Sequence, residues 1–280
     1  MEYLNLIEKS REVTLKMLTI KNLSKTFNPN TINENKVFDG LSLEVNEGDF
    51  ISIIGSNGAG KSTLLNMISG TILADSGTII LNGQNVSNKK EHERCKNIGR
   101  VFQNPSLGVA PNMTILENLS LADNKGKTYG LSLGINKKRI DHYIDLLKEV
   151  DLGLEDKLYN KVELLSGGQR QALTLLMAVM SHPKLLLLDE HTAALDPKTS
   201  EKIMAITKKI VQERNITTLM VTHNLKHAMD SGNRLFMMHM GQIVIDVKGA
   251  EKAELNTDKL FELFEKVHVK DDLSDRTLFG

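Results

Sequence analysis

The feature that most constrains this chain is a glycine-rich segment, GSNGAGKST at residues 55–63, which directly follows a short apolar run at residues 50–54. The segment matches the pattern G-x-x-x-x-G-K-[ST], and residues 64–69 after it are predicted to form a helix. Glycines let a backbone wrap closely around phosphate groups, and the N–H groups at the start of a helix favour negative charge. We therefore expect a buried strand, a phosphate-binding loop and a helix, in that order.

Within this loop, one side chain is predicted to contact phosphate and another to contact metal. Lys61 is predicted to reach the β- and γ-phosphates of a nucleotide, and the Ser62 hydroxyl is predicted to ligate Mg²⁺. The alternative is an ordinary glycine-rich turn, and the flanking strand and helix count against it. The expected nucleotide-binding residues of the loop are Gly55, Asn57, Gly58, Ala59, Gly60, Lys61, Ser62 and Thr63.

A second constraint is the segment LLLLDEHTAALDP at residues 185–197, in which four leucines lead into two acids. The leucines fit a strand buried on both faces, and ligands of doubly wound sheets sit beyond the carboxyl ends of the strands. Asp189 is predicted to hold Mg²⁺, directly or through water, and Glu190 to accept a proton from an attacking water. The alternative is a strand that simply ends in solvated acids.

The third motif is LSGGQ at residues 165–169, placed before a predicted helix. With the two motifs above, in this order, the chain resembles the ATP-binding subunit of an ATP-binding-cassette transporter, from Leu18 to about Val247. In that family two cassettes pack head to tail. The resemblance therefore implies that Ser166, Gly167 and Gly168 touch the γ-phosphate of ATP held by a second cassette. Hydrolysis then requires two copies of the chain, or a partner cassette.

The same resemblance assigns four more positions. Gln103, in VFQNP, matches the glutamine that lies near Mg²⁺ and the attacking water, and so joins Ser62 and Asp189 as a metal residue. Asp196, in ALDP, matches an aspartate that acts across the dimer. His223, in MVTHN, matches the histidine that contacts the γ-phosphate, and Phe27 the aromatic residue that stacks on adenine. Taken alone, such a histidine or phenylalanine is more often structural.

His191 departs from the family pattern, which often has proline or alanine after the glutamate. One hypothesis is that an imidazolium here lowers the pKa of the Glu190 carboxyl. The alternative is a tolerated variant that points away from the phosphate.

Strands that alternate with helices indicate an α/β fold. The expected class is a P-loop nucleoside triphosphatase with a mostly parallel sheet, an N-terminal antiparallel β part and an inserted helical subdomain. Residues 1–16 match nothing in the family pattern and are either a mis-assigned start or a short appended helix. The expected division is an N-terminal extension (1–16), an ATPase core (17–103 and 165–247), a helical subdomain (104–164) and a C-terminal helix and tail (248–280).

Composition excludes several classes of protein. Lys+Arg and Asp+Glu are both 35, so charge gives no reason to expect a nucleic-acid partner. No apolar run approaches the roughly 18–20 residues of a membrane span, and the first residues lack the apolar region of a signal peptide. The chain is therefore expected to be cytosolic, and the family resemblance implies a peripheral location on the cytoplasmic face of the membrane. The single cysteine, Cys95, excludes an intramolecular disulfide framework and is expected to be buried.

The resemblance implies that the chain hydrolyses ATP with Mg²⁺ and serves integral-membrane permease subunits, as a homodimer or paired cassette. An importer working with an extracytoplasmic solute-binding protein is favoured. Residues 111–122 are similar to the region of amino-acid uptake ATPases that receives the permease, and the chain ends too soon after Asp246 for an added regulatory domain. DEHTAALDPKT resembles a bacterial subgroup, some of whose members serve aromatic amino acids. The alternatives are an exporter or lipoprotein-release ATPase, and a soluble cassette acting mechanically on ribosomes or DNA.

Overall fold

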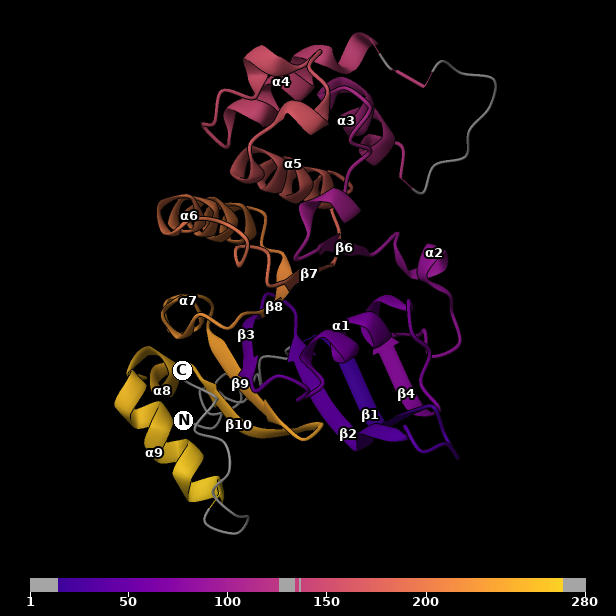
Figure 1. Ribbon diagram of the computed structural model, residues 1–280, viewed down its shortest axis with the longest axis vertical. Coiled ribbons are helices and arrows are strands. Elements are labelled where there is room, and N and C mark those ends of the chain that lie inside the picture. The colour runs from indigo at the N-terminus through magenta and orange to yellow at the C-terminus, as the bar shows by residue number, and fades with distance from the viewer. Residues whose placement is uncertain (1–14, 126–133, 136, 269–280) are drawn as a thin grey trace, which may run out of the picture.

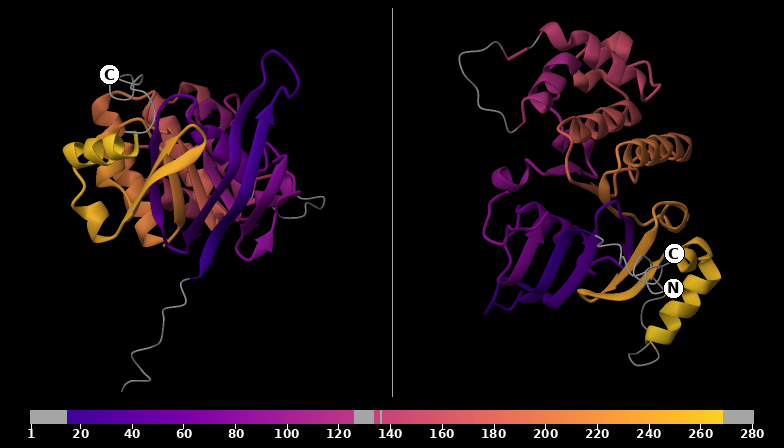
Figure 2. Two further views of the ribbon diagram at one scale, coloured as in Figure 1. Left: turned by 90° about the horizontal axis from the view of Figure 1, so that it is seen from below. Right: turned by 180° about the vertical axis from the view of Figure 1, so that it is seen from behind.

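The computed structural model describes residues 15–125, 134–135 and 137–268, which form two sheets with helices around them (Figures 1 and 2). Most of the predicted extension (1–16) and residues 269–280 of the predicted tail lie outside the described residues. The first sheet has the order β2-β1-β4-β5, and its neighbouring strands are antiparallel. Its strands are β1 (Lys16–Phe27), β2 (Asn35–Asn46), β4 (Ser76–Leu81) and β5 (Gln84–Asn85).

The second sheet has the order β10-β9-β3-β8-β7-β6. All its neighbouring strands are parallel except β10, which pairs antiparallel with β9 in a hairpin. The α/β class with a mostly parallel sheet and an N-terminal antiparallel part is thereby confirmed. The strands are β3 (Phe50–Gly55), β6 (Ile98–Val101), β7 (Leu185–Asp189), β8 (Thr217–Val221), β9 (Arg234–His239) and β10 (Gln242–Lys248).

The four leucines of β7 show why this strand reads as a continuous apolar run. Successive side chains of a strand point to opposite faces of the sheet, so both faces must be covered. Leu185 and Leu187 join the core shared with the antiparallel sheet, and Leu186 and Leu188 join the core on the helical side. All four side chains are 0% exposed.

The helices lie on both sides of this sheet, with α3, α4 and α5 at one end of the long axis and α6 between them and the strands (Figure 1). Residues 104–164 hold α3, α4 and short 3₁₀ turns, while their separation as a subdomain stays a prediction. Within the described ranges, no helix is both long and apolar enough to span a membrane. The helices are α1 (Lys61–Ser69), α2 (Glu91–Arg94), α3 (Ile115–Asp123), α4 (Ile140–Lys148), α5 (Gly167–Met180), α6 (Pro197–Glu213), α7 (Leu225–Asp230), α8 (Ala250–Ala253) and α9 (Thr257–His268).

The helical region is anchored by a cap and by one apolar face. Thr114 begins α3: its hydroxyl accepts a hydrogen bond from the Glu117 N–H (3.2 Å), and the Glu117 carboxylate accepts one from the Thr114 N–H (2.7 Å). In α4, Tyr143 and Leu147 are 0% exposed and pack in the core on the helical side of the sheet. These side chains recur at helical spacing, so α4 buries one apolar face before it ends at Lys148.

Arg94, rather than Cys95, is the buried residue of the short helix α2. Its side chain is 1% exposed, and Cys95 is only partly buried, so the expectation of a buried thiol is wrong. The helix lies at the surface, and the arginine takes its inward position. The guanidinium donates to the carbonyl oxygens of Met67 (2.7 Å), Ile68 (3.1 Å), Ser87 (3.0 Å) and Lys89 (2.7 Å). It thereby ties α2 to the last turn of α1.

We expect Arg94→Met to lower the free energy of unfolding by about 2–3 kcal/mol, because buried carbonyl oxygens lose a charged donor. The measurement is urea denaturation followed by circular dichroism. Lys209→Met, which removes an exposed lysine of α6, is the matched control and should change stability little. Equal stabilities of the Arg94 variant and the wild type would contradict this role.

Candidate functional site

The site is assembled at the carboxyl ends of four neighbouring parallel strands, β3, β8, β7 and β6. The glycine-rich loop follows β3, and His223 lies two residues after β8. Glu190 directly follows β7, and Gln103 lies two residues after β6. Because parallel strands end at the same edge of a sheet, segments far apart in the sequence meet there.

The loop between β3 and α1 has a backbone that only glycine fits at two places. Gly55 has φ +147°, and a Cβ there would lie 2.1 Å from the Met238 carbonyl oxygen. Gly60 has φ +97°, and a Cβ there would lie 2.9 Å from the Phe38 ring. The loop therefore packs tightly on its inner side, while Asn57 and Gly58 are exposed. Its N–H groups and the first turn of α1 form the kind of concavity that binds phosphate.

Lys61 is folded back over this loop. Its amine donates to the main-chain carbonyl oxygens of Gly55 (2.8 Å) and Ser56 (2.9 Å), and the residue is 6% exposed. Burial lowers the pKa of the Lys61 amine, whereas the nearby Glu190 and Asp189 carboxylates raise it. The amine is thus held inside the loop by carbonyl oxygens, with two carboxylates nearby.

Asp189 joins the loop to the strand that carries the acids. Its carboxylate accepts a hydrogen bond from the Ser62 hydroxyl at 3.0 Å. The other carboxylate oxygen lies 3.7 Å from the Arg100 guanidinium, which also donates to the Asn66 side chain of α1 at 2.6 Å. Arg100 was not expected at the site, although a basic residue stands out within the otherwise apolar strand β6.

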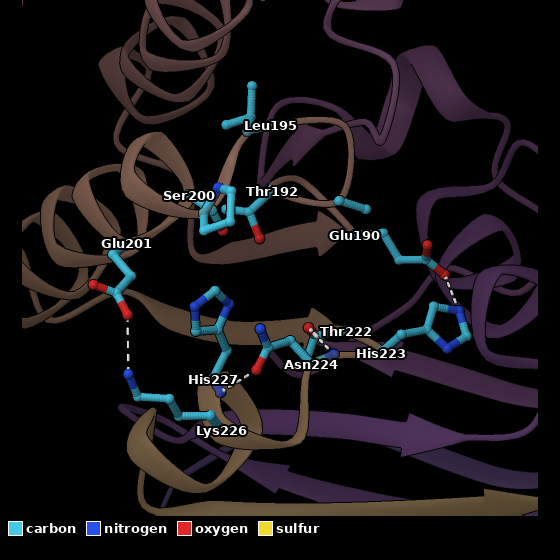
Figure 3. A pocket seen from close by; sticks show the side chains of 12 residues that line it. Glu190, Thr192, Leu195, Ser200, Glu201, Thr222, His223, Asn224, Lys226 and His227 are labelled. Atoms are coloured by element: carbon cyan, nitrogen blue, oxygen red, sulfur yellow. Dashed lines mark hydrogen bonds and ion pairs between the residues drawn. The ribbon is translucent and has the colours of Figure 1, made fainter. Parts of the chain in front are cut away.

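Glu190 is held from three directions. One carboxylate oxygen lies 2.7 Å from His223 Nε2 (Figure 3), and the other accepts a hydrogen bond from the Gln103 side-chain amide at 3.2 Å. The Glu190 N–H donates to the Val221 carbonyl oxygen at 2.9 Å. The backbone has φ +47°, a left-handed conformation that costs a non-glycine residue about 1–3 kcal/mol. Neighbouring contacts therefore hold a strained turn in place.

Phe27 and the loop line one open pocket of about 270 Å³. Phe27 is partly buried at the end of β1, and Lys25 places its amine 5.6 Å from the centre of the Phe27 ring. Glu190 and His223 reach the same pocket from the strand ends. The pocket also includes Asn35 and Val37 of β2, which were not expected from the sequence; the remaining lining residues are Asn57, Gly58, Gly60, Lys61, Ser62 and Thr63.

The LSGGQ residues lie outside the lining of this pocket. Ser166 caps α5 by accepting a hydrogen bond from the Gln169 N–H at 3.3 Å, and Ser166 and Gly167 are exposed. Gly168 is buried, and a Cβ there would lie 2.3 Å from the Thr199 methyl group of α6. Within one chain, these three residues therefore face a different surface from the loop.

Asp196 begins α6 and is exposed. Its carboxylate accepts a hydrogen bond from the Thr199 N–H at 3.1 Å, and hydrogen bonding to Thr199 lowers the pKa of the Asp196 carboxyl. The aspartate thus has a local role as a helix cap and remains accessible at the surface.

His191 does not act as an imidazolium beside Glu190. It is 3% exposed, and its Nε2 lies 3.1 Å from the Thr207 hydroxyl of α6. Burial, and to a smaller extent His227, lower the pKa of His191 to about 4, so the ring is neutral near pH 7. The hypothesis of a charged tuning residue is therefore wrong, because the side chain is inserted into the core beside α6.

Comparison with known proteins adds an independent line of evidence. The family described as ABC transporter matches residues 38–193. A tyrosine transport ATP-binding protein of Clostridioides difficile (strain R20291) is 54% identical over 252 residues, 89% of this chain and 99% of that protein. A phosphonates import ATP-binding protein of Oceanobacillus iheyensis is 35% identical over 82% of this chain and 89% of that protein.

Solved structures show the same arrangement of elements. An ATP-binding cassette of an ABC transporter in its ADP conformation has a TM-score of 0.74 and 29% identity, covering 90% of this chain and 99% of that one. A dimeric cassette in a post-hydrolysis state, bound to ADP and phosphate, has a TM-score of 0.72 and 30% identity, covering 83% and 98%. On this sequence and structural evidence, the chain belongs to the ABC transporter family, as an ATP-binding and ATP-hydrolysing cassette.

Proposed function

We propose that this cassette powers uptake of an amino acid, tyrosine or a related aromatic one, through a separate membrane permease. One observation carries the proposal: 54% identity over 99% of a tyrosine transport ATP-binding protein, in a chain whose strand ends bring the expected catalytic side chains into contact. Relatives named for phosphonate and methionine import also support uptake over export.

In the proposed complex, ATP lies in the pocket that Phe27 and the loop share. Phe27 stacks on the adenine, and the loop N–H groups bind the phosphates. The Lys61 amine leaves the carbonyl oxygens of Gly55 and Ser56 to contact the β- and γ-phosphates. Because Lys61 lies within the loop, the site favours a ligand with several negative charges, such as a triphosphate, over an uncharged one.

The oxygen atoms beside the loop fit a magnesium ion. Ser62 and Asp189 already approach each other at 3.0 Å, and Gln103 donates to Glu190 through its amide nitrogen, so its amide oxygen takes no part in that contact. Hydroxyl, carboxylate and amide oxygens are the donors that Mg²⁺ prefers. We propose these three residues as its protein contacts. Bound Mg²⁺ would neutralise charge on the β- and γ-phosphate oxygens.

Hydrolysis requires a water positioned in line with the γ-phosphate. Glu190 is placed to accept a proton from that water, because its carboxylate lines the nucleotide pocket and is held by Gln103 and His223. His223 donates through Nε2 to Glu190 in the structure, and we propose that it contacts the γ-phosphate when ATP is bound. Gln103 then orients both the carboxylate and the water.

Two cassettes are needed in this proposal. Ser166 and Gly167 are exposed and lie outside the pocket lining, so they are available to cover ATP held by a second copy of the chain. Asp196 is exposed beside α6 and is assigned the contact across that dimer. The dimeric cassette among the similar structures supports this arrangement.

We propose that the permease docks beside the last turn of α3. A pocket of about 390 Å³ lies there, lined by Phe102, Leu107, Leu121 and Met177 among others. Leu107 is 68% exposed and Leu121 49%, so two large apolar side chains of this pocket face solvent together, as expected of a surface that binds another protein. This docking would hold the chain peripherally on the cytoplasmic face of the membrane. The system is also proposed to include an extracytoplasmic solute-binding protein.

We expect Glu190→Gln to lower ATP hydrolysis by about 10²–10⁴-fold, because the variant lacks the proton acceptor. ATP binding should stay within a few-fold of wild type, and Mg-ATP should trap a dimer detectable by light scattering. Glu213→Gln, an exposed position on α6, is the matched control and should hydrolyse normally. Wild-type turnover by Glu190→Gln would refute the assignment.

We expect Lys61→Ala to weaken ATP binding by about 10–150-fold, equivalent to the roughly 1.5–3 kcal/mol of a hydrogen bond to a charged group. Titration with a fluorescent ATP analogue measures the change. Lys209→Ala removes an exposed lysine of α6 and should leave the dissociation constant unchanged. Unchanged affinity in the Lys61 variant would contradict its role.

The transport proposal is tested by isolating tagged Glu190→Gln from native membranes with Mg-ATP. We expect a polytopic permease and a binding lipoprotein to copurify, and calorimetry on the purified lipoprotein to show tighter binding of tyrosine than of methionine or a phosphonate. A permease without a binding protein would favour export. Ribosomal or DNA-associated partners without a permease would contradict the transport proposal.

A further inference from the structure

The turn at Glu190 is strained, and on one side it borders a pocket and so is not held by packing there. Its backbone is left-handed, and the Ala193 N–H closes the turn by donating to the Glu190 carbonyl oxygen at 2.9 Å. Beside it lies a pocket of about 390 Å³, lined by Glu190, Thr192 and Leu195 on one side and by His227 of α7 on the other (Figure 3). On that side the turn faces open space rather than close-packed atoms.

His191 anchors the turn on its other side. The side chain is 3% exposed, and Thr207, its hydrogen-bond partner in α6, is 0% exposed. The Thr207 hydroxyl donates its proton to the Ile203 carbonyl oxygen at 2.8 Å. Because a hydroxyl has one proton, Thr207 can only accept from His191. The ring is therefore the tautomer with the proton on Nε2.

The anchor is part of a helix that also contacts the LSGGQ segment. Thr207 lies in α6, whose first turn holds Thr199 against Gly168. The peptide that follows Glu190 is thus fixed to the same helix that packs against the start of α5. A shift of α6 relative to the sheet would therefore pull on the turn at Glu190 through the His191–Thr207 hydrogen bond.

We propose that His191 is a positioning residue for hydrolysis: its Nε2–H···Oγ bond to Thr207 holds the left-handed turn at Glu190, so that the carboxylate faces the nucleotide pocket. This inference rests on the proposed role of Glu190. The competing explanation is that the imidazole only fills space in the core. The two differ in what a substitution changes, since a space-filling residue affects stability, whereas a positioning residue affects turnover at unchanged nucleotide affinity.

Four variants of the full-length chain separate these explanations. His191→Ala and Thr207→Val each remove one partner of the bond, and the valine keeps the shape of the threonine. His191→Gln keeps an amide N–H near the position of Nε2, and Thr207→Ser keeps the hydroxyl. Each variant is assayed for kcat and KM with Mg-ATP, for affinity with a fluorescent ATP analogue, and for its thermal midpoint. Glu190→Gln is included in the same assay.

The expected result is a fall in kcat of about tenfold or more in His191→Ala and Thr207→Val, the scale of effect that misplacing a reacting group produces. Affinity should stay within about twofold, and His191→Gln and Thr207→Ser should recover most of the turnover, as expected for a restored hydrogen bond. Combining His191→Ala with Thr207→Val should add little to either single change, because both remove the same bond.

Wild-type kcat in Thr207→Val with an unchanged thermal midpoint would overturn the inference. Equal losses of kcat in His191→Ala and His191→Gln, in proportion to a lowered thermal midpoint, would also overturn it. If Glu190→Gln loses turnover in the same assay while the Thr207 variant does not, the inference alone fails. If Glu190→Gln itself turns over like wild type, the proposed role of Glu190 fails and the inference falls with it.

Discussion

The parallel register of four strands is the constraint on which the site depends. Val101 lies opposite Leu188, and Asp189 lies opposite Val221, so β6, β7 and β8 end at nearly the same level. Gln103, Glu190 and His223 therefore emerge side by side without any direct link in the sequence. The hydrogen bonds among these side chains are a consequence of that register. A slip of one residue in β7 would send Glu190 to the opposite face.

The side chains of the site are also held in place by contacts within the protein itself. The Lys61 amine donates to loop carbonyl oxygens, Ser62 donates to Asp189, and His223 and Gln103 share the Glu190 carboxylate. Each of these side chains thus already has a hydrogen-bond or ion-pair partner within the protein. Catalysis by fixed dipoles and charges depends on such arrangement in advance, because little reorganisation is then needed during the reaction.

Much of this could be predicted from the sequence, since the glycine loop, the leucine strand and the order of helices and strands are local patterns. The side chains at the strand ends followed from the same patterns and from the family resemblance. Other features depend on tertiary packing. Arg94 ends the surface helix α2 and Cys95 follows it, and nothing local indicates that the arginine is the buried one. Likewise, His191 is followed by small residues, and its insertion toward Thr207 is decided by the position of α6. The left-handed backbone of Glu190 also has no signature in residue type.

The contact between Gly168 and Thr199 has a consequence for how related sequences are read. Any side chain at position 168 would collide with a methyl group of the same molecule, because the available distance is 2.3 Å. Glycine here therefore allows the start of α5 to pack closely on Thr199 of α6, whether or not phosphate is ever bound across a dimer. A cassette without hydrolysis would still have this packing reason to keep the glycine. Its retention in a distant homologue would therefore indicate preserved helix packing and would not by itself indicate a working nucleotide site.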